Sequence, residues 1–170
     1  MSATPTVRAM EPADWDQVRA IYQHGIDTGH ATFEASAPGW KSFDQSRLPG
    51  HRHVATSPDG AVLGWAAVSP VSARPVYAGV VEHSVYVDPA ARGLGIGTAL
   101  LQELINSTGN AGIWTIQASV FPENEASLRL HLAQGFSIVG RRRRIAHMTH
   151  GPLAGQWRDT LLIERRSDSI

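Results

Sequence analysis

The sequence contains no cysteine, which excludes disulfide bonds, thiolate metal sites and a covalent cysteine intermediate. The sequence has 15 basic and 15 acidic residues, so its formal net charge is zero. A chain without net charge has no overall attraction for nucleic acid or an anionic membrane, and we therefore expect a small-molecule ligand. No apolar signal core or membrane-length apolar run is present, which predicts a cytoplasmic protein. A length of 170 residues with 42% apolar content predicts a single domain over residues 1–170.

Strand-like and helical segments alternate along the chain without an internal repeat or linker. Extended apolar segments predict strands over residues 4–10, 51–57, 61–71, 80–87, 113–121, 136–140 and 156–166. Apolar residues at helical spacing predict helices from Pro12, over residues 41–48, from about Ile96 and over residues 123–134. The order of these elements predicts an α/β (α+β) fold, a mixed sheet with helices on its faces.

Three glycines at alternate positions, Gly93, Gly95 and Gly97, join the strand that ends near Val87 to the following helix. Glycine lets backbone amides approach a ligand closely, and the positive end of the helix dipole favours an anion such as phosphate. Arg92 adds a cation. The spacing matches neither the Rossmann fingerprint nor the Walker phosphate loop. The glycines alone are equally compatible with a simple turn and helix cap.

The residues around these glycines resemble a known family. The stretch from Arg92 to Gly97 matches the Arg/Gln-x-x-Gly-x-Gly/Ala signature of the GNAT acetyltransferase superfamily, and "NEASLRLHLAQGF" resembles its second acetyl-CoA motif. "VEHSVYV", "SLRLHLAQGF" and "GQWRDTLLIER" resemble the phosphinothricin and methionine sulfoximine acetyltransferases within that superfamily. The resemblance implies a GNAT fold, with a mostly antiparallel sheet of about seven strands, about four helices and a splay at the acetyl-CoA cleft. It also implies a homodimer. The connection over residues 147–157 is longer than the family's, which leaves its contacts open.

Glu82 is the candidate general base. In "VVEHSVYV" it shares one face of an otherwise apolar strand with Ser84 and Tyr86. The resemblance implies that this glutamate, directly or through water, takes a proton from the acceptor amine, which attacks a thioester only when neutral. The alternative is a cross-strand salt bridge.

Asn124, Ser127 and His131 lie at helical spacing and form one polar stripe. The resemblance implies that Asn124 hydrogen-bonds the pantetheine arm and that His131 lies near the departing sulfur as a general acid. Because a free thiol has a pKa of roughly 8.5, that acid would be helpful rather than obligatory. The alternative for His131 is a merely hydrogen-bonded histidine.

Acetyl-CoA is the acetyl donor that the resemblance implies, with no metal. Strand amides would stabilise the thioester oxygen, and the glycine loop would hold the pyrophosphate. The implied contacts are Val85, Tyr86, Val87, Arg92, Gly93, Leu94, Gly95, Ile96, Gly97, Thr98, Asn124 and Ser127. The lack of cysteine fits direct transfer in a ternary complex.

The resemblance places four residues near the acceptor: Phe33, Glu34, Arg74 and Tyr77. Arg74 and Tyr77 suit a carboxylate or an oxyanionic head group, although Arg74 is equally compatible with a solvated loop charge. The implied acceptor is an α-amino acid with a tetrahedral, oxygen-bearing side chain, such as phosphinothricin, methionine sulfoximine or methionine sulfone. Another amine, such as a polyamine, a peptide N-terminus or an antibiotic, and a non-catalytic acetyl-CoA sensor remain alternatives.

We expect no ligand at two further features of the sequence, a run of arginines and two pairs of histidines. Arg141 to Arg144 are expected to form a solvated face rather than a site for a CoA phosphate or for nucleic acid. The pairs His51-x-His53 and His147-x-x-His150 lack an acidic or cysteine partner nearby, so we expect no metal there.

Overall fold

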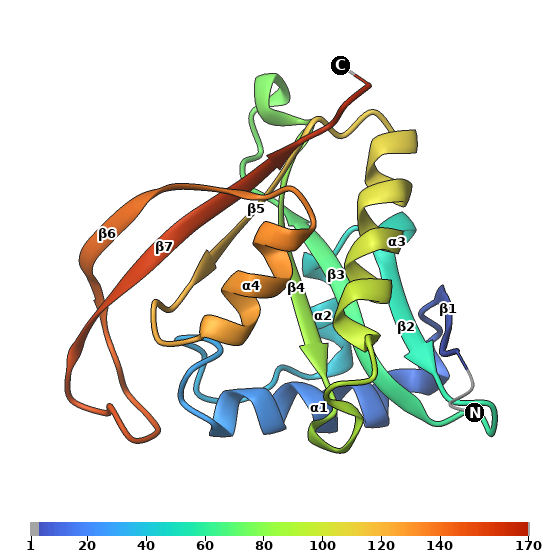
Figure 1. Cartoon of the computed structure of the whole chain (residues 1–170), viewed down its shortest axis with the longest axis horizontal. Helices are drawn as coiled ribbons and strands as arrows, with labels where there is room; N and C mark the ends of the chain where they lie inside the picture. The colour runs from blue at the N-terminus through green and yellow to red at the C-terminus, as the bar shows by residue number, and fades with distance from the viewer. Residues whose placement is uncertain (1–3, 170) are drawn as a thin grey trace.

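The computed structural model describes residues 4–169, and within them the expected mixed α/β fold is confirmed (Figure 1). The strands are β1 (Thr6–Ala9), β2 (Arg52–Thr56), β3 (Val62–Pro70), β4 (Val80–Val87), β5 (Thr115–Val120), β6 (Ser137–His147) and β7 (Trp157–Arg166). The α-helices are α1 (Trp15–Asp27), α2 (Trp40–Ser46), α3 (Ile96–Asn110) and α4 (Glu125–Ala133). None of the helices within residues 4–169 combines the length and the apolar character that a membrane crossing requires.

The seven strands form one sheet in the order β1-β2-β3-β4-β5-β7-β6, in which only β4 and β5 are parallel neighbours. That parallel pairing is short, because it joins only Val80–Glu82 to Thr115–Gln117. Beyond this point β4 continues beside β3 as far as Val87, while β5 continues beside β7 as far as Val120. The sheet is therefore open between β4 and β5 along the second half of each strand.

Two apolar cores cover the two faces of the sheet. The alternation of side chains along β3 divides them, because Trp65 packs with α1 and α2 whereas Val68 packs with α3. The helical stripes predicted from the sequence are confirmed: Val18 of α1 and Leu100 of α3 are fully buried, each on its own face. One side of the sheet is thus the α1 and α2 face, and the other is the α3 face.

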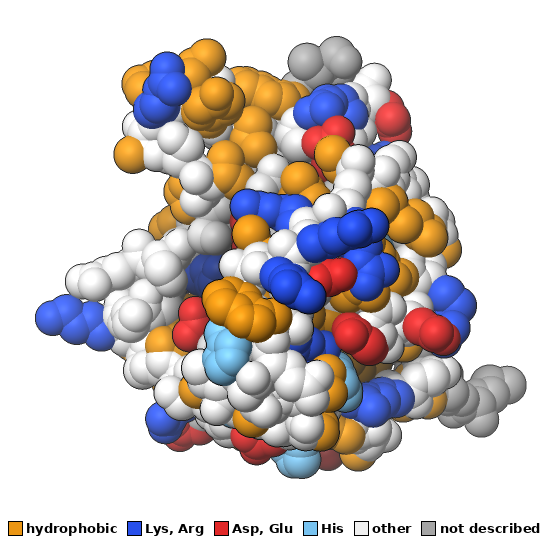
Figure 2. Space-filling view, turned by 90° about the vertical axis from the view of Figure 1, so that its left-hand side faces the viewer, with side chains coloured by type: hydrophobic (Ala, Val, Ile, Leu, Met, Phe, Trp, Pro, Cys, Tyr) orange, Lys and Arg blue, Asp and Glu red, His pale blue; other side chains and the backbone are white. Residues whose placement is uncertain are grey.

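The basic stretch differs from its expected place between two strands. Arg141 to Arg144 lie inside β6, which is an edge strand paired only with β7. The pairing slips between Arg142 and Ala146, and the side chains of all four arginines are exposed, as expected for a solvated face. Arg141 pairs with Asp159 of β7 at 2.7 Å. Figure 1 shows β6 and β7 as a long curved hairpin, and Figure 2 shows basic side chains gathered on the side of the molecule that this hairpin forms.

The packing of α1 against β4 gives a testable prediction at Gly25. A Cβ atom at this position would lie 2.5 Å from Cδ1 of Tyr86, whose ring cannot easily move because it stacks on Trp65 at 4.9 Å and on Tyr22 at 4.8 Å. We expect Gly25→Ala to lower the free energy of unfolding by about 1–3 kcal/mol through overpacking, despite the higher helix propensity of alanine.

Urea unfolding measures this change, with Gly50→Ala as the control because a Cβ at Gly50 meets no atom within 4 Å. Equal stability of Gly25→Ala and the unchanged protein would contradict the packing of Tyr86 described above.

Candidate functional site

A cavity of about 1110 Å³ lies where β4 and β5 separate. It is lined by residues from both faces of β4, because Glu82 and Tyr86 point to the α1 and α2 face while His83 and Val85 point to the α3 face. The cavity therefore passes through the opening in the sheet. Its size suits a ligand larger than a typical drug-sized molecule.

The start of α3 forms one end of the cavity. Gly93 and Gly95 have φ angles of +78° and +77°, a left-handed conformation that favours glycine, and Gly95 is the N-cap of α3. A Cβ at Gly97 would instead lie 3.0 Å from the side chain of Leu130, so this glycine allows α3 and α4 to pack closely. Arg92 also lines the cavity. Free helix amides beside a cation can hold a phosphate group.

The open edge of β4 forms the middle of the cavity. Beyond Glu82 this edge has no strand partner within residues 4–169, so its backbone groups are available to a ligand that carries amides of its own. Asn124 and Ser127 also line this part. The side chain of Asn124 accepts a hydrogen bond from the Ser127 amide at 3.2 Å and donates one to the His30 carbonyl oxygen at 3.2 Å. Asn124 thus caps α4 and holds the loop after α1.

His83 and His131 form a buried pair on the α3 face. Their Nε2 atoms lie 2.8 Å apart. Nδ1 of His83 lies 3.0 Å from the Gln117 carbonyl oxygen, and Nδ1 of His131 lies 2.7 Å from the Ser127 carbonyl oxygen. The Phe136 ring contacts both imidazoles. Neither ring nitrogen of His131 is therefore free to point at a ligand in this arrangement.

The two imidazoles, when neutral, carry fewer N–H hydrogens than they have hydrogen-bonding contacts. A carbonyl oxygen only accepts, so each Nδ1 that bonds to one must carry a hydrogen. With both rings neutral, two hydrogens serve three contacts. A third proton is opposed by burial, which together with the charge of His131 lowers the pKa of His83 to about 3. Burial also lowers the pKa of His131.

Glu82 is exposed. It lies on the α1 and α2 face of β4, opposite Ser69 of β3. Its carboxylate has no ion-pair partner within 4 Å among residues 4–169, so the cross-strand salt bridge is not observed. An exposed carboxylate that lines the cavity can accept a proton from a bound amine.

Most of the predicted contact residues meet at this cavity. Arg74 and Tyr77 do not: they lie on the β3–β4 connection, where the Arg74 guanidinium stacks 5.6 Å from the Tyr77 ring and Tyr77 is 44% exposed. Leu94 also points away and is 52% exposed. The predicted residues that line the cavity are Phe33, Glu34, Glu82, Val85, Tyr86, Val87, Arg92, Gly93, Gly95, Ile96, Gly97, Thr98, Asn124, Ser127 and His131.

Among the lining residues that sequence reasoning missed are His30, Arg47 and His83. The strand alternation placed His83 on the face of the strand opposite to Glu82. No local pattern marks Arg47, because its position depends on how α2 packs against β3. His30 sits in a turn-rich segment whose path is set by distant contacts.

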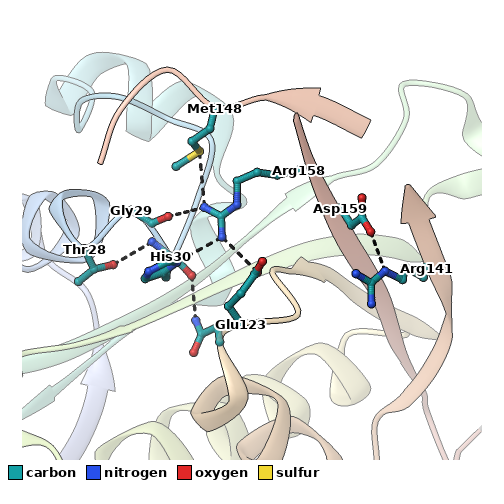
Figure 3. A network of polar contacts seen from close by, with 9 residues as sticks. Thr28, Gly29, His30, Glu123, Arg141, Met148, Arg158 and Asp159 are labelled. Atoms are coloured by element: carbon teal, nitrogen blue, oxygen red, sulfur yellow. Dashed lines mark hydrogen bonds and ion pairs between the residues drawn. The ribbon is translucent and has the colours of Figure 1, made fainter. Parts of the chain in front are cut away.

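Those distant contacts centre on Arg158 of β7, which is buried (Figure 3). Its guanidinium donates to the Gly29 carbonyl oxygen, contacts Nδ1 of His30 at 3.2 Å and pairs with Glu123 at 3.2 Å. The guanidinium also lies 3.6 Å from the centre of the Phe121 ring. Arg158 therefore holds the loop after α1 against the loop before α4.

The longer connection over residues 147–157 supports the same loop. Gly151 packs on Gly29, since a Cβ at Gly151 would lie 2.7 Å from the Gly29 Cα atom. His150 donates through Nε2 to the Ile26 carbonyl oxygen at 3.1 Å, and Met148 is fully buried. The connection thus packs beneath one wall of the cavity.

The paired histidines of the sequence contact other groups. His51 and His53 lie 2.9 Å and 3.1 Å from the Ser107 hydroxyl, and the His147 ring meets the Trp157 ring edge-to-face. Among residues 4–169, no group of three or more histidine or acidic side chains is arranged to hold a metal ion.

The buried histidine pair predicts a pH dependence of stability. An unfolded histidine has a pKa near 6.5, so below about pH 6.5 the unfolded chain binds more protons than the folded one, and the free energy of unfolding falls as the pH falls. Each such histidine contributes a slope of up to about 1.4 kcal/mol per pH unit. We expect His83→Asn to reduce the loss of stability between pH 7.5 and pH 5.0.

Urea unfolding at the two pH values measures the slope, and His24→Asn, at an exposed position on α1, serves as the control. An unchanged slope in His83→Asn would rule out this origin of the pH dependence.

Comparison with known proteins agrees with this geometry. Residues 15–136 match the model of the acetyltransferase (GNAT) family. The chain is 34% identical to the phosphinothricin N-acetyltransferase of Alcaligenes faecalis, over 94% of this chain and 81% of that protein. It is 31% identical to the L-methionine sulfoximine/L-methionine sulfone acetyltransferase of Pseudomonas aeruginosa, over 99% of this chain and 96% of that protein.

A solved structure shows the same fold with its acetyl donor. The phosphinothricin acetyltransferase from Sinorhizobium meliloti, in complex with acetyl-CoA, superposes with a TM-score of 0.85 at 32% identity, covering 97% of this chain and 89% of that one. The expected GNAT fold, with its opening between β4 and β5, is thereby confirmed. The chain belongs to the acetyltransferase (GNAT) family and is an acetyl-CoA-dependent N-acetyltransferase.

Proposed function

We propose that the protein transfers the acetyl group of acetyl-CoA to the α-amino group of a small amino-acid-like acceptor, such as phosphinothricin, methionine sulfoximine or methionine sulfone. The observation that carries this proposal is a single cavity that joins the start of α3 to the exposed carboxylate of Glu82 through the opening in the sheet. The relatives named for these same acceptors support the choice.

Acetyl-CoA supplies the activated acyl group, and the chain supplies the groups that hold it. We propose that the amides around Gly93 and Gly95, with Arg92, hold the pyrophosphate. The open edge of β4 over Val85–Val87 would donate to the thioester oxygen, where negative charge develops as the amine attacks. These donors are fixed by the pairing of β4 with β3, so they need no rearrangement during the reaction.

Glu82 is the proposed general base. It accepts a proton from the acceptor amine, directly or through one water molecule, and the neutral nitrogen then attacks the acyl carbon. The new N–C bond forms, the C–S bond breaks, and CoA leaves as its thiolate, while the second proton that the nitrogen loses passes to the thiolate or to water. The two substrates are bound at the same time in this direct transfer, and no acyl-enzyme is formed.

His131 is the proposed general acid for the thiolate, but its placement limits that role. Both of its ring nitrogens contact protein atoms, so donation requires one contact to exchange. The Ser127 hydroxyl, 3.3 Å from Nδ1 of His131, lines the cavity and offers a route for the proton. A thiol with a pKa of about 8.5 can also leave without help, so the acid contributes less than the base.

We also propose a homodimer, as the family resemblance implies. The edge strand β6 and the start of β7 expose apolar side chains, including Val139 at 55% and Trp157 at 61%. Apolar side chains exposed on an edge strand can be covered by a second chain. Sedimentation velocity is expected to give twice the chain mass of 18.4 kDa. A monomer at micromolar concentration would contradict the dimer.

Thiol release from acetyl-CoA tests the proposed activity. The acceptor panel contains phosphinothricin, methionine sulfoximine, methionine sulfone, common amino acids, a polyamine and a peptide, with release in the absence of acceptor as the blank. We expect saturable activity with the first three acceptors and intersecting double-reciprocal plots, as direct transfer requires. Parallel plots would contradict direct transfer. Acetyl-CoA binding without activity on any acceptor would favour a sensor.

Variants of the two proposed proton-transfer groups test the mechanism. We expect Glu82→Gln to lower kcat by about 10²- to 10⁴-fold, the usual contribution of a general base, with little change in acetyl-CoA affinity. We expect His131→Asn to lower kcat by less than about 10-fold, since the thiolate can leave unprotonated. Asp16→Asn, at an exposed position outside the cavity lining, is the control. Unchanged turnover in Glu82→Gln would remove Glu82 as the base.

A further inference from the structure

We propose that Arg47 binds the α-carboxylate of the acceptor and thereby places the acceptor amine beside Glu82. This inference rests on the proposed function and names the residue that selects free α-amino acids among possible amines. It assigns to Arg47 the role that the sequence resemblance suggested for Arg74, which lies outside the cavity lining.

The backbone at Arg47 is held firmly after the last turn of α2. Its amide donates to the Phe43 carbonyl oxygen at 3.1 Å, and its own carbonyl oxygen accepts from the buried guanidinium of Arg52 at 2.6 Å. The following amide, of Leu48, donates to the Val68 carbonyl oxygen on β3 at 2.9 Å. The Arg47 backbone is therefore anchored by contacts to α2, β2 and β3, and its side chain lines the cavity.

The Arg47 guanidinium has no counter-ion among the described residues. It donates to the Ser69 hydroxyl at 3.3 Å and lies 5.4 Å from the centre of the Phe43 ring, and its buried Nε has no hydrogen-bond partner in that part of the chain. No carboxylate within residues 4–169 lies within 4 Å of it, whereas Arg52 pairs with Asp44 at 2.6 Å. A partly buried cation without a partner is costly unless an anion binds there.

Arg47 and Glu82 border the same part of the cavity. Ser69, which accepts from Arg47, is the direct cross-strand partner of Glu82, and the side chains of such partners lie on the same face with Cβ atoms about 4.5–5.5 Å apart. The two opposite charges are thus neighbours across Ser69, yet they do not pair with each other. An α-amino acid carries a carboxylate and an amine on one carbon, which matches this arrangement of a cation beside a carboxylate.

The surrounding side chains suit such a ligand. Burial raises the pKa of the Tyr22 and Tyr86 phenols, an effect that the positive charge of Arg47 opposes, so both phenols stay neutral at pH 7. A guanidinium binds a carboxylate through two parallel hydrogen bonds, which a lysine cannot reproduce. A polyamine or a peptide N-terminus lacks a carboxylate on the reacting carbon, so neither would gain from Arg47.

Kinetics with two matched acceptors test the proposal. Methionine sulfone and its α-carboxamide share the amine and the side chain and differ only in the α-carboxylate. We expect Arg47→Gln to lower kcat/KM for methionine sulfone by about 10- to 100-fold, the usual effect of losing a charged bidentate pair. The value for the carboxamide should change less than about threefold. Arg47→Lys should restore part of the loss. Arg74→Gln tests the alternative site, and Arg19→Gln, at an exposed position of α1 outside the cavity lining, is the matched control.

Two outcomes would overturn the proposal. An equal loss for both acceptors in Arg47→Gln would show a structural role, and a selective loss for the acid in Arg74→Gln would return the carboxylate to Arg74. Norleucine, which lacks side-chain oxygens, distinguishes the two ends of the acceptor. If Arg47 binds the side-chain oxygens, Arg47→Gln will leave norleucine acetylation unchanged, and this result also overturns the proposal.

Calorimetry separates this proposal from the proposed function. Methionine sulfone is titrated into the protein saturated with CoA, so binding is measured without turnover. Weaker binding in Arg47→Gln but not in Arg74→Gln supports the assignment even if the physiological acceptor is another amino acid. Binding that is equal in the three proteins, or absent in all, would overturn it.

Discussion

The separation of β4 from β5 is the constraint on which the rest of the site depends. After three paired residues, β5 stays with β7 and β4 stays with β3, so one edge of β4 is left without a strand. The loss of those ladder hydrogen bonds is costly in a folded protein unless another group satisfies them. A ligand that enters the opening can do so, and the opening also connects the two faces of the sheet through one cavity.

The two faces carry different chemistry because strand alternation separates their side chains. On the α3 face, the glycine turn and the start of α3 suit an anionic, extended ligand. On the α1 and α2 face, Glu82 and Arg47 offer opposite charges to a zwitterion. Arg158, reaching from β7, keeps the loop after α1 in place as one wall of the cavity (Figure 3). The long curved hairpin of β6 and β7 is thus part of the architecture of the site.

Local patterns predicted the elements well because their physical cause is local. The buried stripe of α1 and the left-handed glycines before α3 could be read from spacing and residue type. The exposure of Glu82, the absence of Arg74 from the cavity and the presence of Arg47 could not, because each depends on how distant segments pack. Alternation did place His83 on the strand face opposite to Glu82, yet its contact with His131 could not be predicted, because it depends on the position of α4. The basic stretch became strand because β7 pairs with it, a contact that its composition does not indicate.

The central claim is that donor and acceptor reach the opening from opposite faces of the sheet. A crystal structure with CoA and N-acetyl-methionine sulfone tests it most directly. The account predicts the pyrophosphate at the amides before α3, the thiol of CoA between β4 and β5, and the product on the α1 and α2 face, with its acetylated nitrogen beside Glu82. A product bound on the α3 face, or a CoA chain that does not enter the opening between β4 and β5, would contradict the account.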